Sequence, residues 1–360
     1  MKIVIISRLC YPASGPRANR TTELAKELVR QNNEVTIYAL LGDYDYSEYS
    51  KKTGIRFKNL GQAKYGLSSN TGKKTNLFYK FLRKVFGKYT LFPETLFIPM
   101  VKKAIKNEKE IDVLITIAVP HILHMATALS DLSKIKTWIA DCGDPFMGNP
   151  FHRPPFYFEY FERKWCEKCN YITVPVESAI NAYYPEFYNK IKVIPQGFDF
   201  GSTKIASYHP NKVVTFAYSG AFYKGLRDPS AFLRYLTTIK IPYKFIIYTK
   251  DISLLLPYIK ELGQNIEIRE YIPREDLIYE LSKMDFLVNI PNNSGVQQPS
   301  KLIDYALTKR PILEVSSEFT EDVKSRFMEF IAGDYHQQQV FANLEQYNIV
   351  NVAKHFLALV

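Results

Sequence analysis

Short apolar runs alternate with helical patterns along the whole chain, and the first 40 residues show the repeating unit. Residues 2–6 are an apolar run typical of a fully buried strand, and residues 7–19 follow as a loop with prolines and a glycine. A helix is predicted from about Arg20, and a second strand covers residues 34–40. The inner stripe of the helix consists of Leu24, Ala25, Leu28 and Val29. This βαβ pattern predicts a parallel sheet.

The same alternation continues to residue 313. Further strands are predicted at residues 111–118, 136–140, 171–175, 192–194, 213–218, 243–248, 266–268 and 286–289. Residues 195–199 indicate a hinge between two successive α/β halves, and 360 residues exceed the usual size of one domain. We therefore predict an α/β protein with two Rossmann-like domains, at residues 1–197 and 198–339.

The stretch from residue 291 to residue 313 combines a polar loop, a helix and a buried strand. The helix is predicted to begin near Ser300, with Leu302, Ile303, Ala306 and Leu307 on its apolar face. A helix N-terminus presents free N–H groups and about half a positive charge, so a diphosphate fits there, and Lys301 adds a full charge. Asp304 lies one turn further on, where it can accept hydrogen bonds from vicinal hydroxyls. The alternative is an ordinary connection within a parallel sheet.

The net charge of +11 comes from one segment. Residues 51–90 hold eleven Lys or Arg residues and no acid, and residues 75–88 place aromatic and aliphatic side chains on one helical face, mostly opposite the cations. A basic amphipathic helix can lie on an anionic membrane surface, or its apolar face can pack on its own domain. Nucleic-acid binding is disfavoured because the basic run lacks a known recognition fold.

Several kinds of site are disfavoured by the sequence. The four cysteines are too few and too scattered for a secreted disulfide framework. Cys166 and Cys169 have zinc-knuckle spacing without a second pair or a close histidine, so reduced thiols are favoured. The first loop matches neither the dinucleotide fingerprint nor the phosphate loop, and no suitable D-x-D pair indicates a metal. No apolar run reaches membrane-spanning length, and the first strand is too short for a signal peptide.

His121 follows the predicted strand 111–118, at the carboxyl edge where open α/β sheets bind their ligands. A contact with substrate and a purely structural role are both compatible with this position. His124, one turn further into the helix, is expected to be a packed or capping residue.

Several short stretches, in this order and at these spacings, carry a family resemblance. They are Tyr11-Pro12, Gly15-Pro16-Arg17-Ala18, Ile139-Ala140-Asp141 with Asp144-Pro145, residues 193–199, Tyr218-Ser219-Gly220, Arg227-Asp228-Pro229 and residues 299–306. Together they resemble the retaining glycosyltransferases of family 4, over most of the chain. The resemblance implies the GT-B fold, in which two Rossmann-like domains face each other across a cleft that holds a nucleotide sugar. It also implies that a C-terminal helix, at about residues 340–360, packs back onto the first domain.

The resemblance assigns roles to individual residues. Those implied in approaching or neutralising the donor diphosphate are Gly15, Pro16, Arg17, Lys224, Arg227 and Lys301. Those implied in completing the donor site are Gly220, Asn293, Gly295, Gln297, Ser300 and Asp304. Those implied at the transferred sugar or the acceptor are His121, Asp144 and Asn19. Because negative charge develops on the leaving diphosphate, catalysis is assigned to His121, Lys224, Arg227 and Lys301, and no metal or other cofactor is expected.

Two positions depart from the family pattern. The family's paired glutamates lie eight positions apart, and eight positions before Asp304 is Val296, which cannot bind a sugar hydroxyl. Nearby polar groups, Asn292, Asn293, Gln297 or the backbone at Gly295, are the expected substitutes. Gly143 also stands where many relatives carry a basic residue.

The resulting prediction is a retaining glycosyltransferase that moves a sugar from a nucleoside-diphosphate donor to a lipid-linked saccharide acceptor in bacterial surface polysaccharide synthesis. It is expected to be cytoplasmic and peripheral at the inner face of the cell membrane, held at anionic lipid through residues 51–90. The alternatives are an enzyme resembling a nucleotide-sugar 2-epimerase and a catalytically inactive membrane-bound scaffold. No nucleic-acid partner is expected.

Overall fold

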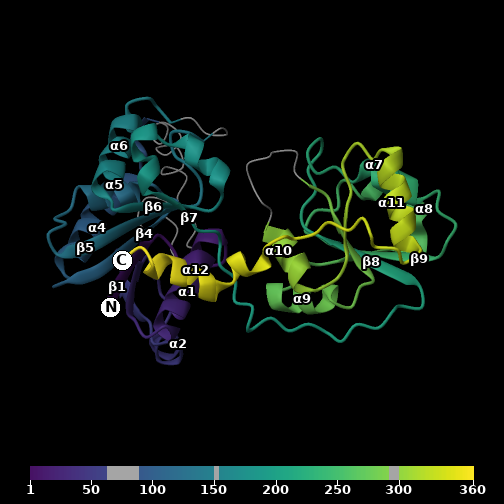
Figure 1. The fold of residues 1–360 in the computed structure, drawn as a ribbon, viewed down its shortest axis with the longest axis horizontal. Coiled ribbons are helices and arrows are strands. Elements are labelled where there is room, and N and C mark those ends of the chain that lie inside the picture. Colours follow the sequence, from purple (N-terminus) through teal and green to yellow (C-terminus); the bar gives the residue numbers. More distant parts are fainter. Residues whose placement is uncertain (63–88, 150–153, 292–299) are drawn as a thin grey trace. The chain divides into compact units, whose positions relative to one another are not determined.

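The computed structural model describes residues 1–62, 89–149, 154–291 and 300–360, with Ser300 described by its backbone alone. The chain divides into two compact units (Figure 1). Unit 1 comprises Met1–Asp199 together with Gln346–Val360, and unit 2 comprises Phe200–Glu345. The boundaries expected from the sequence, after residues 197 and 339, lie close to these.

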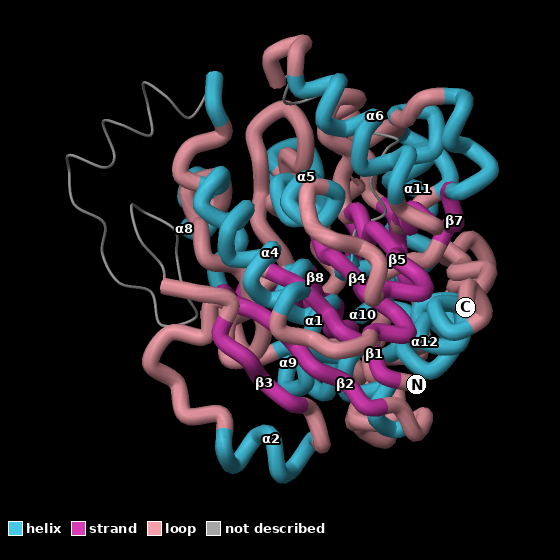
Figure 2. The backbone as a smooth tube through the Cα atoms, turned by 90° about the vertical axis from the view of Figure 1, so that its left-hand side faces the viewer, coloured by secondary structure: helices cyan, strands magenta, loops and turns pink. Residues whose placement is uncertain are grey.

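Unit 1 is built on a seven-stranded parallel sheet with the order β3-β2-β1-β4-β5-β6-β7 (Figure 2). The strands are β1 (Lys2–Ser7), β2 (Glu34–Ala39), β3 (Arg56–Asn59), β4 (Ile111–Ala118), β5 (Ile135–Cys142), β6 (Tyr171–Val174) and β7 (Ile191–Val193). The strand order reverses between β1 and β4. In doubly wound sheets, ligands bind outside the carboxyl ends of the strands at such a reversal.

Helices cover both faces of this sheet. One face packs on α4 (Phe97–Lys106), α5 (Ile122–Ala128) and α6 (Phe158–Lys168), around the buried Trp138 and Trp165. The other face packs on α1 (Pro16–Arg30) and α12 (Ile349–Leu357). The side chains that join these two helices to the sheet include Leu24, Leu28, Ile349, Val352 and Phe356. The last helix of the chain therefore completes the core of the first unit.

Short elements connect these layers. In unit 1 they are α2 (Ser47–Thr53) and the 3₁₀ helices η1 (Glu94–Leu96), η2 (Glu177–Ala182) and η3 (Pro185–Lys190). Outside unit 1 or at its border they are η4 (Gly263–Asn265) and η5 (Leu344–Tyr347).

The start of α1 corrects one expectation. The apolar stripe predicted a helix from about Arg20, whereas the helix begins at Pro16. Gly15 precedes it with a φ of 127°, a conformation that side chains rarely adopt, and Pro16 occupies the first turn, where its missing N–H costs no hydrogen bond. The glycine and proline in the loop were therefore the start signal for the helix.

Unit 2 is a second parallel sheet, with the order β10-β9-β8-β11-β12. Its strands are β8 (Val214–Ser219), β9 (Tyr243–Tyr248), β10 (Ile266–Arg269), β11 (Phe286–Asn289) and β12 (Ile312–Glu314). Its helices are α7 (Ser230–Leu236), α8 (Leu256–Leu262), α9 (Arg274–Leu281), α10 (Ser300–Leu307) and α11 (Glu321–Ile331). Phe216 stacks on Phe245 and Phe286, with ring centroids 4.8 and 4.7 Å away, and α7 and α11 cover this aromatic core. The helices α9 and α10 cover the opposite face.

Most of the basic segment at residues 51–90 lies outside the described residues, including the amphipathic helix predicted at 75–88. In its described part, Lys58 pairs with Glu108 and Arg56 pairs with Glu34, so two of these cations have acidic partners. Within the described ranges, no helix is long and apolar enough to cross a bilayer.

Candidate active site

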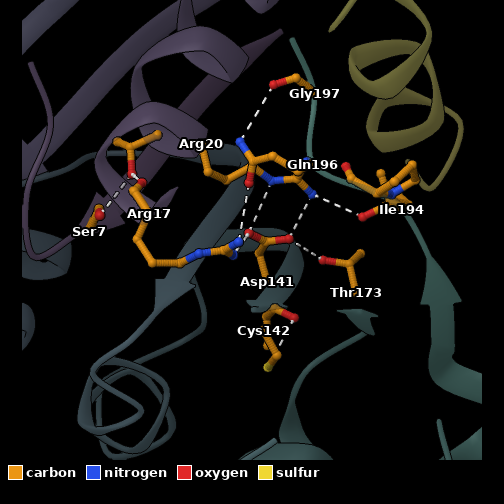
Figure 3. A network of polar contacts seen from close by, with 12 residues as sticks. Ser7, Arg17, Arg20, Asp141, Cys142, Thr173, Ile194, Gln196 and Gly197 are labelled. Atoms are coloured by element: carbon orange, nitrogen blue, oxygen red, sulfur yellow. Dashed lines mark hydrogen bonds and ion pairs between the residues drawn. The ribbon is translucent and has the colours of Figure 1, made fainter. Parts of the chain in front are cut away.

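Asp141, near the carboxyl end of β5, is the centre of a buried polar network in unit 1 (Figure 3). Arg20 on α1 donates from Nε and Nη2 to its two carboxylate oxygens, at 3.2 and 2.9 Å, and the Thr173 hydroxyl donates to Oδ1 at 2.7 Å. Burial opposes the charge of Asp141, but Arg20 and Arg17 outweigh burial and lower the pKa of this carboxyl. Asp141 is therefore ionised at neutral pH.

Arg20 uses its donors within the fold. Its side chain is 2% exposed, and it also donates to the carbonyls of Pro195 and Ile194, at 2.6 and 3.4 Å. The guanidinium lies 4.9 Å from the centre of the Phe356 ring on α12. Arg20 thus ties α1, β5 and the segment after β7 together, which is a structural role.

Arg17, one turn earlier on α1, is the more accessible cation, with 24% of its side chain exposed. Its Nη1 lies 3.5 Å from Asp141 Oδ2, and its Nη2 donates to Gln196 Oε1 at 3.2 Å (Figure 3). The guanidinium also fills the space beside Gly143, where a Cβ would lie 2.6 Å from Arg17 Cζ. Arg17 therefore places a cation beside Gly143.

His121 and Asp144 lie at the same edge of the sheet. His121 immediately precedes α5 and is 6% exposed, and Asp144 is exposed in the loop after β5. Burial, helped by the charge of Arg17 and opposed by a hydrogen bond to the Asp144 backbone, lowers the pKa of His121 to about 4. His121 is therefore neutral at pH 7 and can serve a substrate as a hydrogen-bonding group, not as a cation.

The N-terminus of α1 adds backbone donors to this edge. Gly15 is half-buried, and Pro16 and Asn19 are exposed. In the described structure, no side chain caps this end of the helix. Its N–H groups and the positive end of its dipole are thus available to an anion or a hydroxyl.

In unit 2, Lys301 and Arg227 form a pair of neighbouring cations. Lys301 Nζ donates to the Ile290 carbonyl at 2.9 Å and lies 4.7 Å from the centre of the Tyr218 ring. Burial, and after it the charge of Arg227, lowers the pKa of Lys301 well below its ordinary value. Arg227 Nη1 donates to the Ala221 carbonyl at 3.3 Å, while its buried Nε has no hydrogen-bond partner among the described residues. An anion bound between these two groups would relieve both costs.

The loop after β8 presents Arg227 in a tight turn. Gly220 begins it with a φ of 137° and donates its N–H to the Tyr248 carbonyl at 3.0 Å. Tyr223 and Arg227 exchange backbone hydrogen bonds at 3.1 and 2.9 Å, and Gly225, with a φ of 77°, turns the chain between them. Lys224 is exposed at the tip of this turn.

Asp304, in the second turn of α10, is held by a residue that sequence reasoning missed. Arg274, the first residue of α9, donates from Nε to Asp304 Oδ1 at 2.8 Å, and its Nη2 lies 2.6 Å from the same oxygen. Burial raises the pKa of Asp304 in spite of the opposing charge of Arg274. Tyr305, the next residue, binds the N–H of Ser219 at 2.7 Å and so fixes α10 against the end of β8.

Comparisons with known proteins were made by sequence and by structure. No protein-family model matches the sequence. No curated protein matches it either.

Solved structures match nearly the full length of the chain at low sequence identity. A glycosyltransferase from Rickettsia africae aligns with a TM-score of 0.60 and 11% identity, over 99% of this chain and 97% of its own. TarM from S. aureus aligns with a TM-score of 0.64 and 11% identity, over 100% and 98%. Anabaena HepE, solved in complex with UDP-glucose, aligns with a TM-score of 0.60 and 9% identity, over 99% of each chain. The chain has the GT-B fold.

In this GT-B protein some of the predicted residues of each unit lie near one another. In unit 1, Arg17 lies within electrostatic range of both His121 and Asp144. In unit 2, Arg227 and Lys301 are neighbours, while Lys224 stays on the surface of its turn. Three predicted donor residues, Asn293, Gly295 and Gln297, lie outside the described residues, and so does Val296.

Sequence reasoning missed Arg20, Gln196 and Arg274 as parts of these GT-B sites. Arg20 meets Asp141 across 121 positions, Arg17 meets Gln196 across 179, and Arg274 meets Asp304 across 30. Asp141 and Gln196 stand in the stretches that carry the family resemblance, which was the available signal for unit 1. Arg274 lies in none of those stretches and had no such signal.

Proposed function

We propose that this chain is a retaining glycosyltransferase that moves a sugar from a nucleoside-diphosphate donor to a saccharide acceptor. The observation that carries the proposal is the pair Arg227 and Lys301 in unit 2. Burial and the charge of Arg227 lower the pKa of Lys301, and the buried Nε of Arg227 has no hydrogen-bond partner among the described residues. The GT-B fold supports it, as do glycosyltransferases among the structural neighbours.

The chemistry follows from charge. The acceptor O–H attacks the anomeric carbon, the bond from that carbon to the diphosphate oxygen breaks, and the acceptor proton passes to the departing diphosphate. Negative charge grows on the diphosphate along this path. Lys301, Arg227 and the N-terminus of α10 stabilise the transition state more than the bound donor, because the charge is largest there. No metal is needed for this stabilisation.

The residues of unit 1 are assigned to the sugar and the acceptor. Neutral His121 can accept or donate one hydrogen bond to a sugar hydroxyl, and exposed Asp144 can accept one. Asp304 is assigned to the ribose hydroxyls, with Arg274 holding the carboxylate in place. Arg17 and the start of α1 are assigned to the donor diphosphate, to which they would contribute positive potential.

A panel of nucleoside diphosphates tests the donor assignment. UDP, GDP, ADP, CDP and dTDP are added in turn to the wild type and to Lys301→Ala, and the thermal midpoint of unfolding is measured. A ligand at 100 times its Kd stabilises the folded state by about 2.7 kcal/mol. We expect one nucleotide to raise the midpoint of the wild type and of the surface control Lys324→Ala, and to raise the midpoint of Lys301→Ala much less. No shift with any nucleotide would support an inactive scaffold instead.

Transfer itself is tested with the sugar donor of the nucleotide so identified. Release of nucleoside diphosphate that depends on a saccharide acceptor supports transfer. Release of free sugar product in the absence of any acceptor would support an epimerase. Retention is read from the anomeric configuration of the product by NMR.

We further propose that the acceptor is lipid-linked and that the protein binds anionic membranes through residues 51–90. The composition of that segment supports this, since eleven cations without an acid would be attracted to an anionic surface. Replacing Lys80, Arg83, Lys84 and Lys88 by Gln should abolish flotation with vesicles that contain anionic lipid. Replacing Lys102, Lys103, Lys106 and Lys109 by Gln is the matched control. Unchanged flotation of the first variant would end the membrane proposal.

A further inference from the structure

Three potential metal ligands lie together beneath the carboxyl edge of the unit 1 sheet. They are His121 and His124, at the start of α5, and Cys142, the last residue of β5. One ligand atom from each lies within 4.8 Å of the other two. The three side chains are 6%, 0% and 1% exposed. We refer to them as the His–Cys trio.

The distances in the trio approach those of a zinc site. Cys142 Sγ lies 3.4 Å from His124 Nε2. With Zn–S near 2.3 Å and Zn–N near 2.0 Å, a tetrahedral ion separates a sulfur and a nitrogen ligand by roughly 3.5 Å. A ring nitrogen of His121 lies within 4.8 Å of both other ligand atoms, compared with roughly 3.3 Å between two nitrogens bound to one tetrahedral zinc ion.

His121 also has a buried atom that the protein leaves unsatisfied. Its Nδ1 has no hydrogen-bond partner among the described residues. Buried polar atoms in folded proteins nearly always have a partner, and an exception calls for a water or an ion. The unpaired Nδ1 of His121 is an observation independent of the distances between the three ligand atoms, and it also favours a bound metal ion.

Neighbouring side chains hold the His124 ring in an orientation that suits a metal ligand. The Thr116 hydroxyl lies 2.7 Å from His124 Nδ1, so Nε2 is the nitrogen turned toward Cys142. Trp138 Nε1 donates to the same hydroxyl at 2.9 Å. Metal-bound histidines commonly have their second nitrogen fixed in this way.

We propose that the His–Cys trio binds one zinc ion, with the fourth position left to water. Binding breaks the S–H bond of Cys142, forms a bond from the sulfur to the metal and releases one proton to solvent, with no change of oxidation state. A consequence, which rests on the proposed transferase function, is that a bound ion holds His121 away from the sugar and inhibits transfer.

Cobalt titration tests the site without an activity assay. Co²⁺ is added to the full-length protein under reducing conditions, and the absorption spectrum is followed. We expect one equivalent of Co²⁺ to give the charge-transfer band of a cobalt–thiolate bond and the visible bands of tetrahedral cobalt, and Zn²⁺ to displace both. Absence of a thiolate band in the wild type overturns the proposal.

Matched variants locate the binding. Cys142→Ser keeps the size of the side chain and a hydrogen-bonding atom for His124, and it should lose the band. Cys169→Ser changes another buried free thiol and should keep it. Thr116→Val should weaken cobalt binding about 10-fold, and Thr116→Ser should restore it. A band that survives Cys142→Ser, or that disappears in Cys169→Ser alone, contradicts the assignment.

The same samples distinguish loss of a metal ligand from loss of folding, and failure of the metal proposal from failure of the proposed function. Circular dichroism shows whether each variant is folded, and His124→Gln provides a second removal of a ligand if Cys142→Ser is not. If cobalt binds as expected but the protein neither binds a nucleotide nor transfers a sugar, the metal site is supported and the proposed function is contradicted. If transfer is found without a cobalt–thiolate band, the reverse holds.

Discussion

Asp141 in unit 1 and Asp304 in unit 2 are both largely buried and both pair with an arginine, yet their pKa values shift in opposite directions. Arg20 and Arg17 lower the pKa of Asp141 against the effect of burial. Burial prevails at Asp304, where Arg274 is the opposing charge, and raises its pKa. Unit 1 thus compensates its buried carboxylate internally. In unit 2, burial outweighs the compensating charge at Asp304, and burial together with the charge of Arg227 lowers the pKa of Lys301.

The largest expected effect comes from breaking the compensated network. Arg20→Ala leaves the Asp141 carboxylate buried without its main partner and should lower the free energy of unfolding by about 3–5 kcal/mol. Urea unfolding followed by tryptophan fluorescence measures this for unit 1, because Trp138 and Trp165 both lie in its core. The control is Arg30→Ala, whose half-exposed side chain pairs with Asp199 and should contribute about 1 kcal/mol or less. Equal losses in the two variants would show that burial of the network adds nothing.

The next largest effect is on nucleotide affinity, which should be reduced more by a substitution in unit 2 than by one in unit 1. Lys301→Ala removes a charged contact with the diphosphate, which is worth about 1.5–3 kcal/mol, so Kd should rise about 10- to 100-fold. Arg17→Ala should raise Kd less than about 3-fold, because the charge of Arg17 is already partly compensated by Asp141. Isothermal titration calorimetry with the nucleotide identified above measures both. A larger loss for Arg17→Ala would reverse the comparison.

Proton uptake on nucleotide binding offers a sharper test of the proposed contact between Lys301 and the diphosphate. The pKa of Lys301 is lowered in the free protein, and a bound diphosphate would raise it, so binding should take up a proton. Affinity should then increase as the pH falls, by up to about 10-fold per pH unit between the free and bound pKa values. Titrations in two buffers of different ionisation enthalpy count the protons. The uptake should vanish in Lys301→Ala and persist in Lys324→Ala.

The smallest effect expected is that of Gly143→Ala. The new methyl group would lie 2.6 Å from Arg17 Cζ, at the end of a flexible side chain, so Arg17 should move aside with less than about 1 kcal/mol lost from stability. Transfer should fall as far as in Arg17→Ala, and the double variant should be no slower than either single one, because both changes remove the same cation. Full activity of Gly143→Ala would show that transfer does not depend on the position of the Arg17 side chain.

The fold was largely predictable from sequence because parallel strands buried on both faces leave continuous apolar runs. Apolar runs of this kind predicted strands at residues 2–6, 111–118 and 286–289, which correspond to β1, β4 and β11. The position of His121 at a carboxyl edge followed from the same pattern, as did the packed position of His124.

The candidate site was less predictable, because its pairings depend on distance in space. Arg20 was read only as the start of a helix, although it is the main partner of Asp141. Nothing local in the sequence indicates that Arg274 on α9 meets Asp304 on α10. The His–Cys trio was missed for the same reason, since Cys142 lies 18 positions after His124, at the end of the following strand.

The helix α12 reverses the usual order of events during synthesis. Domains generally fold as units, the N-terminal one first, as the chain is made. Residues 200–345 form one continuous piece, whereas the core of unit 1 needs residues 349–357, which are translated after all of unit 2. The core of the first unit therefore stays incomplete until after residues 200–345 have been made, and a chain truncated after residue 345 should expose the apolar side of α1.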